Sequence, residues 1–364
     1  MASTYKSIRD IDWPLLLITL AISAVGILQI YSATHETKWK DAWWKQIVWT
    51  LAGLVLFWIV SKIDYPTLLG QAYLMYGLGV TGLIAIFFIG TRVFGSRRWI
   101  PLPGGFQFQV SEFIKVVLVL LIARYLTELK RNDLDWRELL KVSGLVGLPM
   151  ILVMKQPDLG TSLTYMPILL SGVFLAGLRW KYIAIIALGF ALVLPVSYYM
   201  LHDYQRARLT SFLDPAQDPR GSGYQVIQSM IAVGHGGMWG EGVTRGTQTQ
   251  LQFLPVPHTD FIFSAFAEEH GFVGVVVVLG LYFLLLMQIV QNAQTAPDRA
   301  GMYICMGVCS LLLFHVLVNV GMVVGRMPVA GIPLPLMSSG GSNTISVFIM
   351  LGLVNNVRLR RFVN

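Results

Sequence analysis

Charged residues are scarce in this chain of 364 residues, and cysteine is nearly absent. Asp, Glu, Lys and Arg make up 13% of the sequence, whereas soluble domains carry roughly 25%. The two cysteines, Cys305 and Cys309, lie one helical turn apart in an apolar run. A disulfide framework or a zinc site needs more ligands than these two, so we interpret both as small buried packing residues.

Several catalytic signatures are also missing. The chain contains no phosphate loop ending in Gly-Lys-Ser/Thr, no His-Glu-x-x-His motif and no serine nucleophile elbow. The net charge is +8, but Lys and Arg are dispersed through short loops and the C-terminus rather than arranged in a basic stripe with aromatic residues. This pattern argues against nucleic acid as a partner and favours topology signals and anionic membrane lipids.

Apolar residues, in contrast, make up 55% of the sequence. A soluble core cannot bury this much apolar surface, so the composition predicts an all-α polytopic membrane protein with one integral membrane domain over residues 1–364. A helix needs about 20 apolar residues to cross a bilayer, and the apolar runs therefore predict about ten transmembrane helices. The first run is as long as a full span, which argues against a cleaved signal peptide. The expected spans are roughly 14–34, 43–62, 67–90, 110–127, 139–156, 160–178, 181–201, 264–291, 301–325 and 340–357.

One long polar stretch, from His202 to about Phe261, separates the seventh expected span from the eighth. A polar loop of this length cannot stay in the bilayer core. Ten spans place both termini on one side, and the basic residues at 358–361 favour the cytoplasmic side for them. The loop, about 202–263, is then extracytoplasmic, and a long glycine-rich loop on a membrane scaffold is a place where function is expected.

Ionisable residues also occur where two of the expected spans begin. Glu112 and Lys115 lie three residues apart and share a helix face. Because charges inside a span are costly, the two either form a structural ion pair or line a polar cavity. Asp158 follows Pro157, where its side chain can cap the next helix and also line a cavity.

Polar and basic residues in the loops are candidates for substrate contacts. Arg97 and Arg98, next to Trp99, suit a phosphate and the face of a sugar, and they suit equally well an ordinary belt at the lipid headgroups. A proline-rich segment, 326–343, opens the last expected span, and exposed N–H groups at a helix start bind anions. The further candidates are Arg208 and His258 in the long loop and Ser338, Ser339 and Gly340 in the proline-rich segment.

Asp260 is the residue that we expect to carry the chemistry. It follows His258 and directly precedes a long apolar run, so its carboxylate is expected at the mouth of a membrane cavity. A lone Asp before a helix is often an N-cap. That reading is weakened here because Glu268 and Glu269 follow on the next turns, and acids gathered at one membrane mouth raise one another's pKa.

These segments together resemble the SEDS family of cell-wall proteins (shape, elongation, division and sporulation). The resemblance covers almost the whole chain, from Tyr31-Ser32-Ala33 to the last helix, and its five motifs occur in order. Gly331-Ile332-Pro333-Leu334-Pro335 and the run from Phe212 to Tyr224 are similar to the elongation-type members rather than the division-type ones. Small departures are Arg326, where an apolar residue is common, and Ser339, where an aromatic is common. The five motifs are Ser96-Arg97-Arg98-Trp99-Ile100, Gln109 with Ser111-Glu112-Phe113-Ile114-Lys115, Gln156-Pro157-Asp158-Leu159-Gly160-Thr161, His258-Thr259-Asp260-Phe261-Ile262-Phe263 and Ser338 to Ser342.

The resemblance implies a peptidoglycan glycosyltransferase of the bacterial cytoplasmic membrane. Such proteins polymerise lipid II into β-1,4 glycan strands on the extracytoplasmic side, with a class B penicillin-binding protein and the elongation machinery as partners. The family's essential loop aspartate falls on Asp260, its Glu/Lys pair on Glu112 and Lys115, and its other cavity acid on Asp158. Asp260 is then expected to act as the general base.

The leaving pyrophosphate requires cations, and Arg97, Arg98 and Arg208 are the candidates. A divalent cation, Mg²⁺ or Mn²⁺, is compatible with this chemistry, but the sequence specifies no metal site. Two alternatives come from other classes: a lipid II transporter (flippase) and a non-catalytic scaffold for a transpeptidase. Lipid scrambling that survives loss of Asp260, with no glycan product, would favour the transporter. Harmless conservative changes at Asp260, Glu112 and Asp158 would favour the scaffold.

Overall fold

The computed structural model describes residues 11–93, 96–102, 106–129, 134–178 and 223–361, together with a few single positions between 181 and 215. The expected span at 181–201 and most of the polar loop before residue 223 lie outside the described residues. The total of ten spans therefore stays a prediction.

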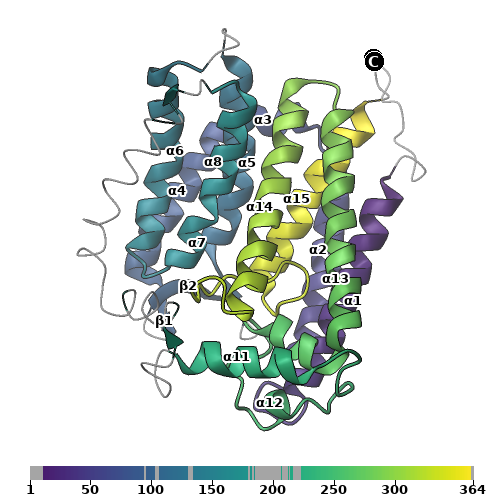
Figure 1. Ribbon diagram of the computed structural model, residues 1–364. Coiled ribbons are helices and arrows are strands. Elements are labelled where there is room, and N and C mark those ends of the chain that lie inside the picture. The colour runs from purple at the N-terminus through teal and green to yellow at the C-terminus, as the bar shows by residue number, and fades with distance from the viewer. Residues whose placement is uncertain are drawn as a thin grey trace.

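Long helices that run along one common direction form the body of the protein (Figure 1). Each arises from one apolar run, as the sequence predicts. Among the described residues, five helices are long and apolar enough to cross a membrane, namely α1, α2, α4, α13 and α14. The long helices are α1 Trp13–Thr34, α2 Ala42–Lys62, α4 Ala72–Ile89, α5 Val110–Glu128, α6 Trp136–Met154, α8 Tyr165–Leu175, α13 Ile262–Gln294, α14 Arg299–Val323 and α15 Gly341–Arg360.

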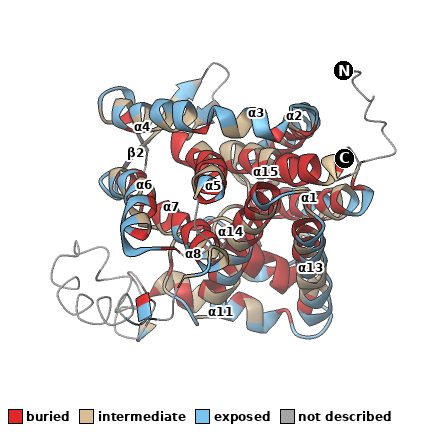
Figure 2. Cartoon of the chain, turned by 90° about the horizontal axis from the view of Figure 1, so that it is seen from above, coloured by how far each residue is buried: buried red, intermediate tan, exposed pale blue. Residues whose placement is uncertain are grey.

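The core lies along α5, α14 and α15, which occupy the middle of the bundle when it is viewed from its end (Figure 2). The most apolar part of α14 is 61% buried, whereas that of α4 is only 17% buried. On α4 the exposed side chains are apolar, and Phe88 is 81% exposed. An apolar outer surface around a packed core is the pattern of a bundle surrounded by lipid, so α4 lies at the lipid boundary.

Two expected spans are divided in the structure. The span expected at 67–90 consists of α3 Tyr65–Gly70 and α4, and the one at 160–178 consists of α7 Leu159–Leu163 and α8. The second division has a clear cause, because Pro167 has no N–H to donate to the carbonyl of Leu163.

The described chain is almost entirely helical, as predicted, but a small antiparallel sheet that the sequence did not predict precedes α5. Its strands are β1 Thr91–Val93, β2 Ser96–Leu102 and β3 Phe106–Phe108, in the order β1-β2-β3. The stretch between α4 and α5 is too short and too polar to form a span. Its backbone groups pair with one another in the sheet instead.

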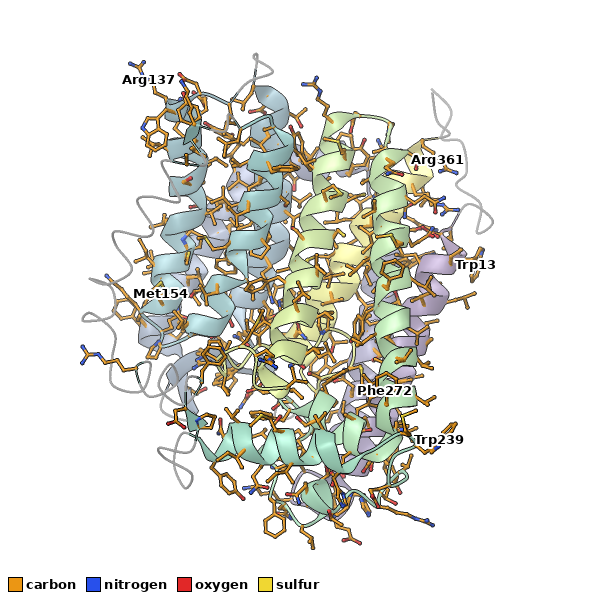
Figure 3. All side chains as sticks on the ribbon, viewed as in Figure 1. Trp13, Arg137, Met154, Trp239, Phe272 and Arg361 are labelled. Atoms are coloured by element: carbon orange, nitrogen blue, oxygen red, sulfur yellow. The ribbon has the colours of Figure 1, made fainter. Side chains whose placement is uncertain are left out.

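Two helices lie within the described part of the polar loop. They are α11 Tyr224–His235, which crosses the end of the bundle, and the short α12 Thr247–Gln250 (Figure 1). Trp239, in this loop, lies at the opposite end of the helices from Arg361, and Trp13 lies toward the Arg361 end (Figure 3). Both ends of the described chain are therefore remote from the loop.

The helix α13 is broken at Gly271, where φ is 64° and ψ is −166°. Residues 237–242 replace the lost helical turn: Phe272 N donates to Gly237 O at 2.9 Å, and Glu241 N donates to Glu268 O at 3.0 Å. The approach is so close that a Cβ on Gly271 would lie 2.4 Å from Gly240 N. These glycines allow the loop to satisfy backbone groups that the break exposes.

Candidate active site

Asp260 lies at the loop end of the bundle, two residues before α13 begins. The N-cap position of α13 is Phe261, so the simple N-cap interpretation of Asp260 is wrong. The Asp260 main-chain carbonyl accepts a hydrogen bond from Asn319 Nδ2 at 2.9 Å. Its carboxylate lies against the backbone of Gly331, because a Cβ built on Gly331 would be 3.5 Å from Asp260 Oδ2.

Gly331 belongs to a non-helical segment, residues 330–338, that packs between α13 and α14. Pro333 and Pro335 have no N–H groups, so this segment cannot continue a helix. Buried side chains form hydrogen bonds with its carbonyl groups instead. Asn319 Nδ2 donates to Ile332 O at 2.8 Å, the His315 Nδ1 atom lies 3.0 Å from Pro333 O, and the Tyr282 hydroxyl donates to Pro335 O. Irregular backbone at membrane depth is tolerated when protein groups pair with it in this way.

The end of this segment is joined to the residues just before Asp260. Ser338 Oγ accepts from Leu334 N at 2.8 Å and donates to Thr259 O at 2.7 Å, while Ser339 N donates to His258 O at 2.9 Å. Ser338 is fully buried and uses its hydroxyl within the protein. We therefore expect Ser338 to position the loop rather than to touch substrate.

Gly340 completes this group of predicted residues, and its N–H donates to Gln46 Oε1 at 3.3 Å. His258 is buried, and its ring lies against Trp39 with 5.5 Å between the ring centroids. Burial lowers the pKa of His258 to about 4, so the imidazole is neutral at ordinary pH.

A second group of predicted residues surrounds Asp158. The Asp158 side chain caps α7 by accepting from Thr161 N at 3.1 Å, which confirms the capping prediction. Its other carboxylate oxygen, Oδ2, lies 3.3 Å from Arg98 Nη1 and accepts from Gln109 Nε2 at 3.3 Å. Arg98 also donates from Nη2 to Pro157 O at 2.7 Å. The same carboxylate thus joins the strand β2, the start of α5 and the start of α7.

The two groups meet at the segment 330–332. A Cβ on Gly160 of α7 would lie 2.2 Å from Ala330 O, so α7 packs directly on the backbone next to Gly331. Gly331 in turn lies against Asp260. The structure thus brings the helix capped by Asp158 and the loop that carries Asp260 to neighbouring residues of one short segment.

Glu112 and Lys115 form an ion pair within the bundle, with 2.7 Å between Lys115 Nζ and Glu112 Oε2. Both side chains are buried, and Ser346 Oγ on α15 donates to Glu112 Oε2 at 3.4 Å. The two side chains therefore form the expected ion pair, and their role in lining a cavity for substrate stays a prediction. A buried pair contributes little net stability, but loss of one partner leaves an uncompensated charge.

Glu268 and Glu269, the acids that the sequence predicts near Asp260, each have hydrogen-bond partners from other segments. Glu268 accepts from the Gln248 and Thr249 backbone N–H groups at 2.7 and 3.1 Å, which fixes the start of α12. Glu269 accepts from Gln29 Nε2 at 3.1 Å and from the Ser32 hydroxyl. Both carboxylates are buried and hold the loop onto α1 and α13.

Arg208 and the side chain of Arg97 lie outside the described residues. Across the part of the chain that the structure describes, no three His, Cys, Asp or Glu side chains are grouped as a metal site requires. The sequence interpretation missed His315 and Asn319. Two polar residues four positions apart in an apolar helix share one face, and this spacing could have indicated that they contact another segment of the protein.

Comparison with known proteins gives consistent results over nearly the full length. The family model for cell cycle proteins that comprises FtsW, RodA and SpoVE matches residues 12–361. The chain is 38% identical to the peptidoglycan glycosyltransferase MrdB of Escherichia coli (strain K12) over 359 residues, covering 96% of this chain and 94% of MrdB. It is 33% identical to the peptidoglycan glycosyltransferase RodA of Treponema pallidum (strain Nichols), covering 98% of this chain and 99% of RodA.

Two solved structures are similar to this fold. A chain from a study of structural coordination of polymerization and crosslinking by a peptidoglycan synthase complex gives a TM-score of 0.84 at 34% identity, covering 97% of this chain and 99% of that chain. The rod shape determining protein RodA of Thermus thermophilus gives a TM-score of 0.72 at 29% identity, covering 97% of this chain and 98% of that chain.

Proposed function

Because the chain belongs to the family of cell cycle proteins that comprises FtsW, RodA and SpoVE, and is a peptidoglycan glycosyltransferase of cell elongation, we propose that Asp260 is its general base. The observation that carries the proposal is the placement of Asp260. Asp260 is only partly buried and its carboxylate lies near Gly331 at one end of the bundle, while neighbouring main-chain groups are held by Asn319, Ser338 and Ser339. A general base needs access to substrate and a fixed geometry, and the partial exposure and the held main chain of Asp260 support this role.

In the proposed reaction, the Asp260 carboxylate removes the proton from the 4-hydroxyl of an acceptor N-acetylglucosamine. The freed oxygen attacks C1 of the donor N-acetylmuramic acid. The new C1–O4 bond forms as the C1–O bond to undecaprenyl pyrophosphate breaks, and the electron pair of that bond leaves with the pyrophosphate. Attack from the opposite face inverts the anomeric carbon. One carboxylate suffices because pyrophosphate is a good leaving group, whereas a glycosidase needs a second acid.

The departing pyrophosphate carries negative charge, and Arg98 is the described candidate to stabilise it. Its guanidinium is 27% exposed and is held in place by Asp158 and the Pro157 carbonyl. A planar cation with a fixed orientation suits bidentate phosphate contacts. Arg97 and Arg208 remain candidates for the same role, and the proposal routes no step through a metal ion.

The protein is an integral inner-membrane protein, and we place its termini in the cytoplasm and Asp260 on the extracytoplasmic side. The positive-inside rule supports this orientation, because Arg137 and Arg361 lie at the end opposite to Trp239 (Figure 3). The proposed substrate is lipid II and the proposed partner a class B penicillin-binding protein. The related synthase complex, which coordinates polymerization and crosslinking, supports a transpeptidase partner.

The test is polymerisation of purified lipid II by the isolated protein, with and without the transpeptidase partner. We expect glycan strands from the wild type and at least a 100-fold loss with Asp260→Asn, the order of magnitude of general-base catalysis. Glu241→Gln, which neutralises an exposed acid elsewhere in the same loop, is the matched control and should retain activity. Wild-type yield from a folded Asp260→Asn protein would remove Asp260 from the mechanism.

A further inference from the structure

Asn319 joins two segments that form the surroundings of Asp260. It lies in the apolar helix α14 and is 0% exposed. Its amide nitrogen donates to the carbonyl of Asp260 at 2.9 Å and to the carbonyl of Ile332 at 2.8 Å. A carboxamide nitrogen carries two hydrogens, so both of its donors are used.

The chemistry of these two contacts fixes the orientation of the amide. If the Asn319 amide were rotated by 180°, its oxygen would face the carbonyl oxygens of Asp260 and Ile332. Two acceptor–acceptor contacts would replace two hydrogen bonds, which is unfavourable in a buried site. The amide nitrogen is therefore the group that holds the two carbonyls.

One of the two carbonyls is that of Asp260 itself, and the other belongs to Ile332, which directly follows Gly331. Gly331 has φ of 65°, and a Cβ placed on it would lie 3.5 Å from Asp260 Oδ2. One turn before Asn319 on the same helix, His315 Nδ1 lies 3.0 Å from Pro333 O. The helix α14 thus fixes both the main chain of Asp260 and the segment against which its carboxylate lies.

A second buried asparagine makes the same kind of contact far from Asp260 and therefore serves as a comparison. Asn356 on α15 is also fully buried, and its amide nitrogen also donates to two carbonyls, those of Val60 and Ile63. These carbonyls belong to the end of α2, remote from Asp260. A buried asparagine that donates to two backbone carbonyls therefore occurs both at a purely structural position and at the candidate active site.

We propose that Asn319 is a positioning residue of the transferase: it sets the place of the Asp260 carboxylate through the main chain of Asp260 and through Ile332. This inference rests on the proposed role of Asp260 as general base. Asn319 touches no substrate in this proposal. Its loss should displace the base while substrate binding is retained, and a displacement of 1 Å can lower a rate by about 100-fold.

The test compares Asn319→Asp with Asn356→Asp, in the full-length protein and with lipid II as substrate. Each change keeps the shape of the side chain and removes two donors from a buried site. We expect Asn319→Asp to lower kcat by about 10- to 100-fold with KM changed less than about threefold.

Asn356→Asp is expected to lower the melting temperature with kcat changed less than about threefold. An unchanged kcat for Asn319→Asp would overturn the positioning role, as would equal effects on kcat from both variants. Asn319→Ala covers failure of Asn319→Asp to fold, and it should lower kcat at unchanged KM. Asp260→Asn separates the two proposals: if it is active, the general base is wrong, and if it is inactive while both Asn319 variants keep full kcat, only the positioning role is wrong.

Discussion

Arg98 on β2 and Asp158 at the start of α7 contact each other through 3.3 Å between Nη1 and Oδ2, and Arg98 Nη2 also holds the carbonyl of Pro157. A planar guanidinium can reach a side chain and a carbonyl at once, whereas an ammonium has no such fixed geometry. This contact places a cation of defined orientation at the loop end of the bundle.

Arg98→Lys should therefore lower lipid II polymerisation about tenfold, although it keeps the charge. We expect a loss of about 1 kcal/mol of stability, because the pair is partly exposed. The matched control is Arg124→Lys, since Arg124 also pairs with a carboxylate, Glu128, and donates to two backbone carbonyls. Similar stability losses with activity lost only in Arg98→Lys would match the expectation, whereas full activity in Arg98→Lys would contradict it.

Gly331→Ala tests the surface on which the Asp260 carboxylate rests. Alanine at φ of 65° costs about 1–2 kcal/mol, and its methyl group would approach Oδ2 of Asp260. Gly237→Ala imposes similar strain at φ of 51°, but no atom lies within 4 Å of the added methyl group. We expect comparable losses of melting temperature from both, and a loss of polymerisation of tenfold or more from Gly331→Ala alone. Equal activities of the two variants would show that a methyl group close to the Asp260 carboxylate does not affect polymerisation.

The buried pair of Glu112 and Lys115 can be examined by neutralising one partner or both. Lys115→Met should lower the free energy of unfolding by about 3–5 kcal/mol, because Glu112 is left buried and unpaired. Glu112→Gln combined with Lys115→Met should recover much of that loss. Thermal unfolding in detergent measures both, and Lys141→Met, at an exposed pair with Glu138, should cost no more than about 0.5 kcal/mol. A double variant that is less stable than Lys115→Met would contradict the structural interpretation.

His258 should make the folded state sensitive to mild acid. Its pKa is about 4 in the folded protein against 6.5 normally, so the unfolded chain takes up a proton as the pH falls through 6.5 and the folded chain does not until about 4. The stabilisation is complete above pH 6.5 and is lost between about 6.5 and 4, by roughly 3 kcal/mol at most. The melting temperature of His258→Phe should fall less between pH 7.5 and 5 than that of the wild type.

The control for this measurement is His235→Phe, at an imidazole that is 45% exposed. Its melting temperature should respond to pH as the wild type does. Phenylalanine at 258 keeps an aromatic ring against Trp39, so packing is largely retained. A His258→Phe protein with the full acid sensitivity of the wild type would assign that sensitivity to other groups.

The long helices follow from the sequence because an apolar run of about 20 residues has only one stable form in a bilayer. The capping role of Asp158 and the pairing of Glu112 with Lys115 were also predictable, since both depend on neighbours three residues away. Local spacing is sufficient for contacts of this kind.

Contacts between distant segments were not predictable in the same way. Asn319 looks like any polar residue in a span until the chain brings Asp260 and Ile332 to it. Glu268 and Glu269 lie in the part of the sequence where an acidic site is expected, but Glu268 accepts a hydrogen bond from the backbone of α12 and Glu269 accepts one from Gln29 of α1. The sequence indicated which residues are unusual, and the tertiary contacts determine which of them meet.

The break at Gly271 has a mechanical consequence. Residues 262–270, which follow Asp260 directly, are joined to the rest of α13 through backbone hydrogen bonds to residues 237–242 rather than through a continuous helical axis. A bend or a twist of the membrane-embedded part of α13 is therefore not conveyed along a rigid rod to Asp260. The position of Asp260 depends instead on the hydrogen bonds that this short helical segment makes to residues 237–242 and on the contact of its own main chain with Asn319 of α14.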